Sequence, residues 1–261
     1  MSDPRPDPRG RFSNRVEDYL RGRPGYPPAV ARTLVERFGV DASWTVADVG
    51  AGTGIASAMF LDLGCTVIAV EPNRAMREAA RLQLGGAERF RVVEAAAEST
   101  SLEAASVDLI VVAQAFHWFD KVRFRAESLR ILRPGGVGAL LWNVRMPDAT
   151  PFAAAYEALV REFATDYLAV RHENVSDDDI AAYFGGPYER SLFANVQSLD
   201  RRSLSARLTS SSYLPAAGDA RFAPMLDAIE ALFASHERKG VVELPYEARL
   251  YAGRMQGDRV T

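Results

Sequence analysis

Two acidic residues and a run of alternating glycines form the part of the sequence best suited to ligand binding. Residues 46–54 read V-A-D-V-G-A-G-T-G, an apolar strand that passes into a turn with glycine at every second position. Glycine allows positive φ angles and has no Cβ, so the backbone of such a turn can approach a ligand closely. Asp48 precedes the first glycine by two residues, where it can hold N–H groups of the turn or meet a cationic ligand, and Glu71 follows the next apolar strand, 66–70. With the N-terminus of the predicted following helix, these residues indicate a nucleotide-type site.

The glycine spacing separates the possible nucleotides. The dinucleotide fingerprint is G-x-G-x-x-G, whereas this turn is G-x-G-x-G, which disfavours a nicotinamide oxidoreductase. The turn and its two acids resemble motif I of the class I S-adenosylmethionine-dependent methyltransferases. That resemblance implies glycines close to the methionine part of the cofactor and an acid, Glu71, on the ribose hydroxyls. The residues implied here in cofactor binding are Asp48, Gly50, Ala51, Gly52, Thr53, Gly54, Glu71 and Pro72. A tight strand-to-helix turn without a ligand is the alternative.

A second resemblance lies before the glycine turn. Residues 19–27 read Y-L-R-G-R-P-G-Y-P, which is similar to a signature of the methyltransferase type 11 branch, a group that includes relatives of trans-aconitate methyltransferase. The resemblance implies an N-terminal lid, 12–27, in which Tyr19 and Arg23 reach the cofactor and Tyr26 reaches the substrate. The alternative is a plain connector, since proline and glycine only need to break the helix there.

Other candidate residues follow the third and fourth strands, 90–93 and 107–113. The segment A-A-E-S is similar to the adenine-contacting segment of the family, which implicates Ala97 and Glu98, although Glu98 could equally be a solvated loop acid.

The fourth strand is a continuous apolar run, typical of a strand buried on both faces and therefore central. Ligands of open α/β sheets bind beyond the carboxyl ends of such strands. The block A-Q-A-F-H-W-F-D that follows resembles the same branch; it contributes Gln114 and Ala115 to the cofactor site, Trp118 to the substrate site and His117 as a catalytic proton acceptor. The alternatives are packing for Trp118 and a satisfied loop histidine.

The fifth strand, 137–142, ends in W-N-V-R, and we expect Trp142 and Arg145 to line the substrate pocket. Beyond residue 147 no further strand-helix units of the same kind appear, and residues 246–252 alternate apolar and polar as a half-exposed antiparallel strand does. The prediction is an α/β fold: a doubly wound, seven-stranded, Rossmann-like methyltransferase sheet with a reversed last strand. We expect residues 1–11 to form a disordered tail and 12–27 a lid, and we expect the methyltransferase domain, 28–255, to carry a helical insertion, 147–190, as a partial lid.

Composition limits the function classes. With 261 residues and 48% apolar composition, the chain can bury a full core. The net charge is -3 and no basic run is present, so we expect no nucleic-acid partner. Cys65 is the single cysteine, the start of the chain is not apolar and no apolar run approaches the roughly 20 residues of a membrane span. These features predict a cytoplasmic protein with no membrane partner. The three histidines are scattered, so no metal site is expected, and the oligomeric state is left open.

The predicted activity is transfer of a methyl group from S-adenosylmethionine to a small molecule. An in-line displacement at a sulfonium methyl needs mainly proximity, alignment and exclusion of water. Arg23 and Arg145 are cationic, and a guanidinium pair binds a carboxylate well, which favours a small carboxylic acid as acceptor. The alternative for the arginines is that Arg23 holds the carboxylate of the cofactor and Arg145 lies in solvent. A non-catalytic S-adenosylmethionine-binding or partner protein is the alternative function.

Overall fold

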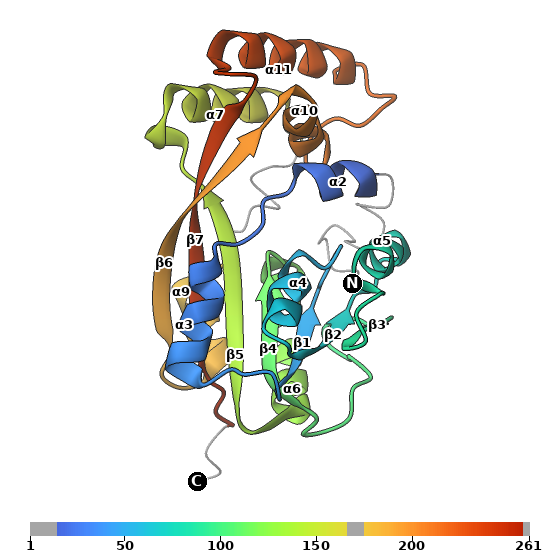
Figure 1. Ribbon diagram of the computed structural model, residues 1–261, viewed down its shortest axis with the longest axis vertical. Coiled ribbons are helices and arrows are strands. Elements are labelled where there is room, and N and C mark those ends of the chain that lie inside the picture. The colour runs from blue at the N-terminus through green and yellow to red at the C-terminus, as the bar shows by residue number, and fades with distance from the viewer. Residues whose placement is uncertain (1–14, 166–174, 258–261) are drawn as a thin grey trace, which may run out of the picture.

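The computed structural model describes residues 15–165 and 175–257, which form a central sheet covered by helices and, above it, a helical lobe (Figure 1). The predicted tail, 1–11, lies outside the described residues, as do residues 12–14 of the predicted lid and 166–174 of the predicted insertion.

The sheet has seven strands in the order β3-β2-β1-β4-β5-β7-β6. They are β1 (Thr45–Val49), β2 (Thr66–Val70), β3 (Phe90–Val93), β4 (Val107–Ala113), β5 (Leu132–Arg145), β6 (Glu189–Leu199) and β7 (Val242–Arg254). β1 to β5 pair in parallel, whereas β7 is antiparallel to both β5 and β6. The predicted fold class is confirmed, including the reversed last strand and the central position of β4. The predicted alternation of the last strand is present from Tyr246 to Leu250, where buried residues alternate with partly exposed ones, and the strand lies between β5 and β6, with β6 at the edge.

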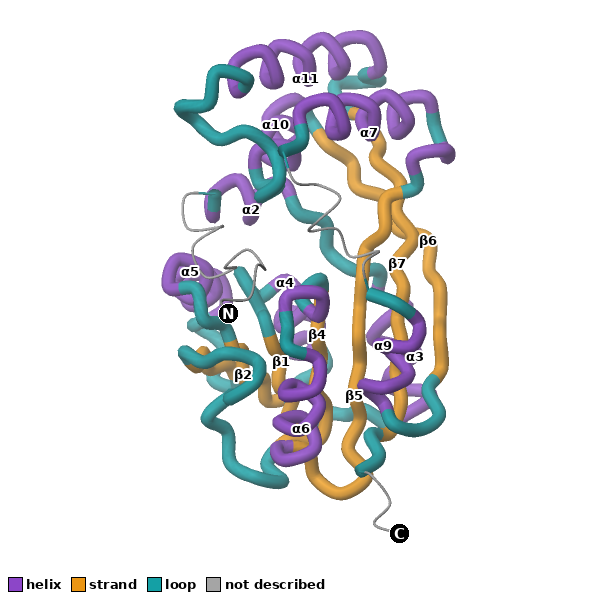
Figure 2. The backbone as a smooth tube through the Cα atoms, turned by 180° about the vertical axis from the view of Figure 1, so that it is seen from behind, coloured by secondary structure: helices purple, strands orange, loops and turns teal. Residues whose placement is uncertain are grey.

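Helices cover both faces of the sheet. They are α2 (Val16–Gly22), α3 (Pro28–Phe38), α4 (Ile55–Asp62), α5 (Arg74–Leu84), α6 (Lys121–Ile131), α7 (Pro151–Phe163), α9 (Asp177–Phe184), α10 (Arg201–Thr209) and α11 (Phe222–His236), with short 3-10 turns at Phe116–Trp118 and Pro147–Ala149. One apolar core joins α3 and α4 to one face and a second joins α6 and α9 to the other. Figure 2 shows α6 and α9 from behind. No described helix is long and apolar enough to cross a membrane.

The upper lobe has a core of its own. It is built from α7, α10 and α11 and from the ends of β6 and β7 that extend beyond the other strands (Figure 1). Tyr156, Met225 and Leu244 are among its buried side chains. The predicted insertion, 147–190, therefore does not match one unit of the structure: α7 belongs to the lobe, α9 packs on the sheet, and α10 and α11 join the lobe from between β6 and β7. The sequence could not show that α7 and α9 belong to different parts of the structure, because the lobe is assembled by contacts between segments that are far apart in the sequence.

The N-terminal helix α2 packs tightly against α10. A Cβ on Gly22 would lie 2.4 Å from the backbone nitrogen of Arg207, so only glycine fits at this contact. Arg15 donates to the carbonyls of Thr209 and Leu214, each at 2.8 Å. The described part of the predicted lid is thus a built-in part of the upper lobe.

Candidate functional site

The glycine turn after β1 has the conformation that its sequence requires. Gly50, Gly52 and Gly54 have φ angles of +72°, +57° and +86°, a region that L side chains rarely adopt. The backbone N–H groups of Gly50 and Ala51 both donate to the carbonyl of Val70, at 2.8 and 3.2 Å. The turn is therefore fixed to the end of β2, beside the acid that follows that strand.

The three glycines differ in what surrounds them. A Cβ on Gly50 would lie 2.6 Å from the Cβ of Ala115, and one on Gly54 would lie 2.7 Å from Leu84. A Cβ on Gly52 would meet nothing within 4 Å. Gly50 and Gly54 thus permit close packing, whereas Gly52 faces open space that a ligand can occupy. Ala115 is the packing partner of the turn.

Asp48 is buried beneath this turn. Its Oδ2 accepts a hydrogen bond from Ser57 Oγ at 2.6 Å, whereas Oδ1 has no hydrogen-bond partner among the described residues. Thr53 Oγ1, within the turn, is also buried and without such a partner. Burial raises the pKa of Asp48 to about 7, and the charge of Glu71 adds to the rise. Two unpaired oxygens next to an open backbone cradle suit a ligand with hydrogen-bond donors or a positive charge.

Glu71 follows β2 and reaches back to the turn. Its Oε2 accepts from Gly52 N at 2.9 Å and its Oε1 from Asn73 N at 2.8 Å. Burial raises its pKa although these two hydrogen bonds oppose the rise. Pro72 presents its carbonyl to Arg77 Nη1 at 2.7 Å, which fixes the start of α5. The carboxylate is held at the mouth of the glycine turn, and its contact with a ribose stays a prediction.

The predicted adenine contacts lie beyond β3. Ala97 is buried in the core, and Glu98 Oε1 accepts from the backbone N–H of Asp120 at 2.8 Å. Glu98 is therefore not a freely solvated loop acid, because it joins its loop to the start of α6. A contact of either residue with adenine stays a prediction.

Gln114 ends β4 in a strained conformation. Its φ angle is +59°, which is uncommon for a residue with a side chain. Its Nε2 donates to the carbonyl of Asn143 at 3.2 Å, and its side chain lines a cavity between the sheet and the upper lobe. Strain of this kind is found at sites where the surroundings impose a particular side-chain direction.

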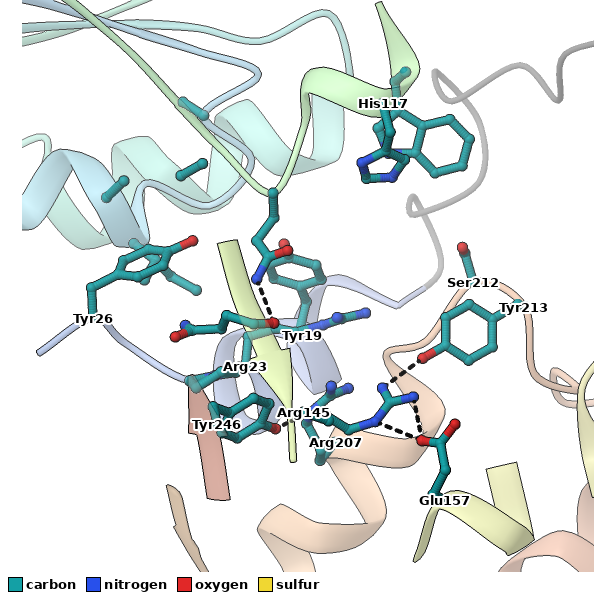
Figure 3. A pocket seen from close by; sticks show the side chains of 18 of the residues that line it. Tyr19, Arg23, Tyr26, His117, Arg145, Glu157, Arg207, Ser212, Tyr213 and Tyr246 are labelled. Atoms are coloured by element: carbon teal, nitrogen blue, oxygen red, sulfur yellow. Dashed lines mark hydrogen bonds and ion pairs between the residues drawn. The ribbon is translucent and has the colours of Figure 1, made fainter. Parts of the chain in front are cut away.

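That cavity brings together most of the residues predicted to meet the acceptor (Figure 3). It has a volume of about 230 Å³. Its walls include the predicted residues Tyr19, Arg23, Tyr26, Ala51, Gln114, His117, Trp118 and Arg145. The rings of His117 and Trp118 lie 4.8 Å apart at the end of β4. The cavity begins at the glycine turn, which contributes Ala51, and extends away from it to the upper lobe.

Trp142 is the exception, and its predicted position at this cavity is wrong. The side chain is 3% exposed and packs edge-on against Phe116 and Tyr251, in the core that faces α6 and α9. Side chains alternate between the two faces of a strand, so on β5 Trp142 and Arg145 point to opposite faces. Only Arg145 reaches the cavity.

Sequence reasoning missed several residues that line the cavity, among them Glu157 on α7, Arg207 on α10, Tyr213 on the loop after α10 and Tyr246 on β7. Arg145 is bound through Nε and Nη2 to Glu157 Oε2, at 3.1 and 2.8 Å, and through Nη1 to the Tyr213 hydroxyl at 3.1 Å. The predicted alternative that Arg145 lies in solvent is thus also wrong. The available signal was an arginine, Arg207, placed between the apolar residues Ala206 and Leu208.

Arg23 and Arg207 have no carboxylate partner among the described residues. Arg207 is 3% exposed and donates through Nε to the Tyr246 hydroxyl at 3.0 Å and through Nη1 to Ser211 Oγ at 3.2 Å. Arg23 donates to the carbonyl of Ser210 at 2.8 Å and lies over the ring of Tyr19. All their partners among the described residues are formally neutral, so within that part of the chain the cavity wall has an excess of positive charge.

This charge perturbs the titration of its neighbours. Burial and the charge of Arg207 lower the pKa of Arg23. Burial alone would raise the pKa of Tyr213, but Arg145, Arg207 and Arg23 outweigh it and lower that pKa to about 7. Tyr26, on the far side from the lobe, has a strongly raised pKa because of burial and the nearby Tyr19 and Asp48. The cavity therefore has a cationic end at the upper lobe. No group of three or more potential metal ligands occurs in the described part of the chain.

Comparison with known proteins agrees with this geometry. Residues 47–140 match the family profile of a methyltransferase domain. An uncharacterized methyltransferase of Mycobacterium tuberculosis is 39% identical over 134 residues, which are 51% of this chain and 52% of the relative. A solved structure assigned as a type II methyltransferase of Anaeromyxobacter dehalogenans has 28% identity and a TM-score of 0.63, covering 89% of this chain and 97% of that one.

These comparisons support the predicted resemblance to the class I S-adenosylmethionine-dependent methyltransferases of the type 11 branch, and the family profile identifies residues 47–140 as a methyltransferase domain. The sequence matches span about half the length of the first curated relatives. The matched profile, 47–140, runs from β1 into β5, whereas the lobe that forms the cationic end of the cavity lies outside it.

Proposed function

We propose that the protein transfers a methyl group from S-adenosylmethionine to a small carboxylic acid. The residues around the glycine turn fit this cofactor: Gly52 faces open space, and Asp48 and Thr53 each present a buried oxygen without a partner. Gly52 and Glu71 would hold the cofactor at the end of β1 and β2. When bound, S-adenosylmethionine supplies the methyl group from its sulfonium centre.

The size of the cavity supports a small acceptor. About 230 Å³ is close to the lower end of small-molecule pockets, roughly 300–1,000 Å³. Tyr19, Tyr26 and Trp118 give its walls aromatic surface, which suits an acceptor with an apolar or aromatic body.

The observation that carries the acceptor class is the pair of arginines without a carboxylate, Arg23 and Arg207. A buried charge is costly unless it is paired, and a carboxylate can satisfy guanidinium donors two at a time. The residues then act by orienting the acceptor and excluding water.

A carboxylate oxygen is already a nucleophile, so an acid acceptor needs no base. His117 would be required only for a hydroxyl acceptor, whose proton an imidazole can accept. We therefore expect His117→Ala to reduce turnover of acids only mildly. The second role weighed for Arg23, binding the carboxylate of the cofactor itself, predicts instead that Arg23→Gln weakens cofactor binding.

The test is a methyl-transfer assay with a panel of small acids and their amides, following formation of S-adenosylhomocysteine. Arg207→Gln is expected to raise the KM for the acid about 10- to 100-fold, the loss of one charge-assisted hydrogen bond, and to leave the Kd of S-adenosylmethionine unchanged. The control is Arg202→Gln, the same substitution on the exposed face of α10. Methylation of a neutral or cationic acceptor would overturn the proposal that the acceptor is a carboxylic acid. Cofactor binding without turnover of any acceptor would favour the alternative of a non-catalytic binding protein.

A further inference from the structure

Tyr213 occupies the cationic end of the cavity, where its hydroxyl accepts from Arg145 Nη1 at 3.1 Å (Figure 3). It lies on the loop between α10 and α11 and is held there by its own backbone, whose carbonyl accepts from Thr165 N at 2.9 Å. Among the described residues, the charged and titratable groups around it are Tyr19 on α2, Arg23 directly after α2, Arg145 on β5, Tyr156, Glu157 and Arg161 on α7, Arg207 on α10 and Tyr246 on β7.

Among the described residues this group has an excess of positive charge, because four arginines face one glutamate. Arg145 pairs with Glu157, which also accepts from Arg161 Nε at 3.2 Å. Arg23 and Arg207 have no carboxylate partner in the described part of the chain. Among the described residues, the Tyr213 hydroxyl lies close enough to Arg145, Arg207 and Arg23 for the charges of all three to act on its titration.

We propose that Tyr213 is the resident counter-ion of this arginine cluster, a phenolate while the cavity is empty, and that it takes up a proton when the carboxylate of an acceptor binds. The inference deepens the proposed function and rests on it for the identity of the incoming anion. The exchange balances: one carboxylate and one proton enter, the phenolate becomes a phenol, and no covalent bond other than O–H forms.

The direction of the pH dependence follows from the charges. The pKa of Tyr213 is about 7 in the empty cavity, so above neutral pH the phenolate already neutralises part of the cluster. A carboxylate roughly 6 Å away, at an effective dielectric constant of about 20, moves the titration upward by about two pH units. Acceptor affinity is therefore expected to fall as pH rises above 7, by up to about a hundredfold.

The experiment is a pH titration of the whole protein, followed by the near-ultraviolet absorbance of tyrosinate. The probe is sodium formate, which carries the carboxylate without any acceptor body, and sodium chloride at equal ionic strength is its control. Tyr213→Phe is compared with Tyr156→Phe, which removes a hydroxyl from the same cluster whose pKa burial raises to about 12.

The wild type and Tyr156→Phe are expected to show one tyrosine that ionises near neutral pH, which formate moves upward, and Tyr213→Phe is expected to lack it. Absence of that ionisation from the wild type, or its persistence in Tyr213→Phe, would overturn the inference. The inference would also be overturned if formate moved the tyrosine titration of the wild type no more than chloride does. That comparison needs only the wild type, so it can be made even if Tyr213→Phe does not fold. Failure of the proposed function gives a different pattern, in which formate moves the titration but the methyl-transfer assay finds no acid acceptor.

Discussion

Replacing Asp48 with asparagine tests the electrostatics of the glycine turn. Asp48 is 0% exposed, and burial, assisted by the charge of Glu71, raises its pKa from 3.8 to about 7. Between these two values the native state holds a proton that the unfolded chain has released. The free energy of unfolding therefore falls as pH rises through this window, and this contribution is absent above about pH 7.

The size of the effect follows from the same two values. About three pH units at 1.36 kcal/mol per unit give roughly 4 kcal/mol. The asparagine side chain cannot ionise, and its oxygen can still accept from Ser57 Oγ, as Asp48 does at 2.6 Å. Relative to the wild type, Asp48→Asn should therefore gain up to about 4 kcal/mol of stability between pH 4 and pH 7.5. It should also bind S-adenosylmethionine more weakly, because a carboxylate facing a cationic ligand is lost.

Urea denaturation of both proteins over that pH range measures the difference directly. The other carboxylates contribute nearly equally to both proteins and cancel. Curves that stay parallel across the range would show that Asp48 ionises normally in the folded protein. A difference that grows toward low pH would show that the sign of the shift is wrong.

Three further predictions concern the same site and the lobe. Gly52→Ala should cost about 1–2 kcal/mol of stability, because its φ is positive, and should abolish cofactor binding by calorimetry; normal binding would place the cofactor elsewhere. Glu71→Ala should weaken S-adenosylmethionine by about 1–3 kcal/mol, and unchanged affinity would refute the ribose contact. Arg15→Ala should speed hydrogen exchange in α2, since two carbonyl contacts at 2.8 Å are lost; exchange as slow as in the wild type would show that α2 is held by its other contacts alone.

The sheet was predictable because its signals are local. A buried strand such as β4 appears as a continuous apolar run, and the alternation at Tyr246 to Ala252 identified the reversed strand. The glycine turn was predictable for the same reason, since Gly50, Gly52 and Gly54 each have a positive φ angle, which glycine adopts readily. The position of Trp142 was predictable too: Leu140, Trp142 and Val144 alternate along one strand, which places all three on the face away from Arg145.

The cationic end of the cavity was not predictable by such means. Arg207 and Tyr213 meet Arg145 across more than sixty positions of sequence, from a helix and a loop whose placement depends on the upper lobe. Local patterns give the periodicity of α10 but not the neighbours of its buried face. An arginine on that face does indicate that something polar or anionic must lie opposite it.

The segment between α2 and α3 explains how the two halves of the site are joined. Gly22 O accepts from Gln197 Nε2 at 3.0 Å, and Gly25 O accepts from Asn143 and Asn195 at 3.1 and 2.9 Å. This segment therefore lies across β5 and β6, with Arg23 and Tyr26 directed into the cavity between its anchor points. A segment fixed in this way cannot open alone without losing three hydrogen bonds to side chains of the sheet. Its glycines and prolines shape a fixed wall, so the exchange of ligands must depend on movement of the upper lobe or on a path that bypasses this wall.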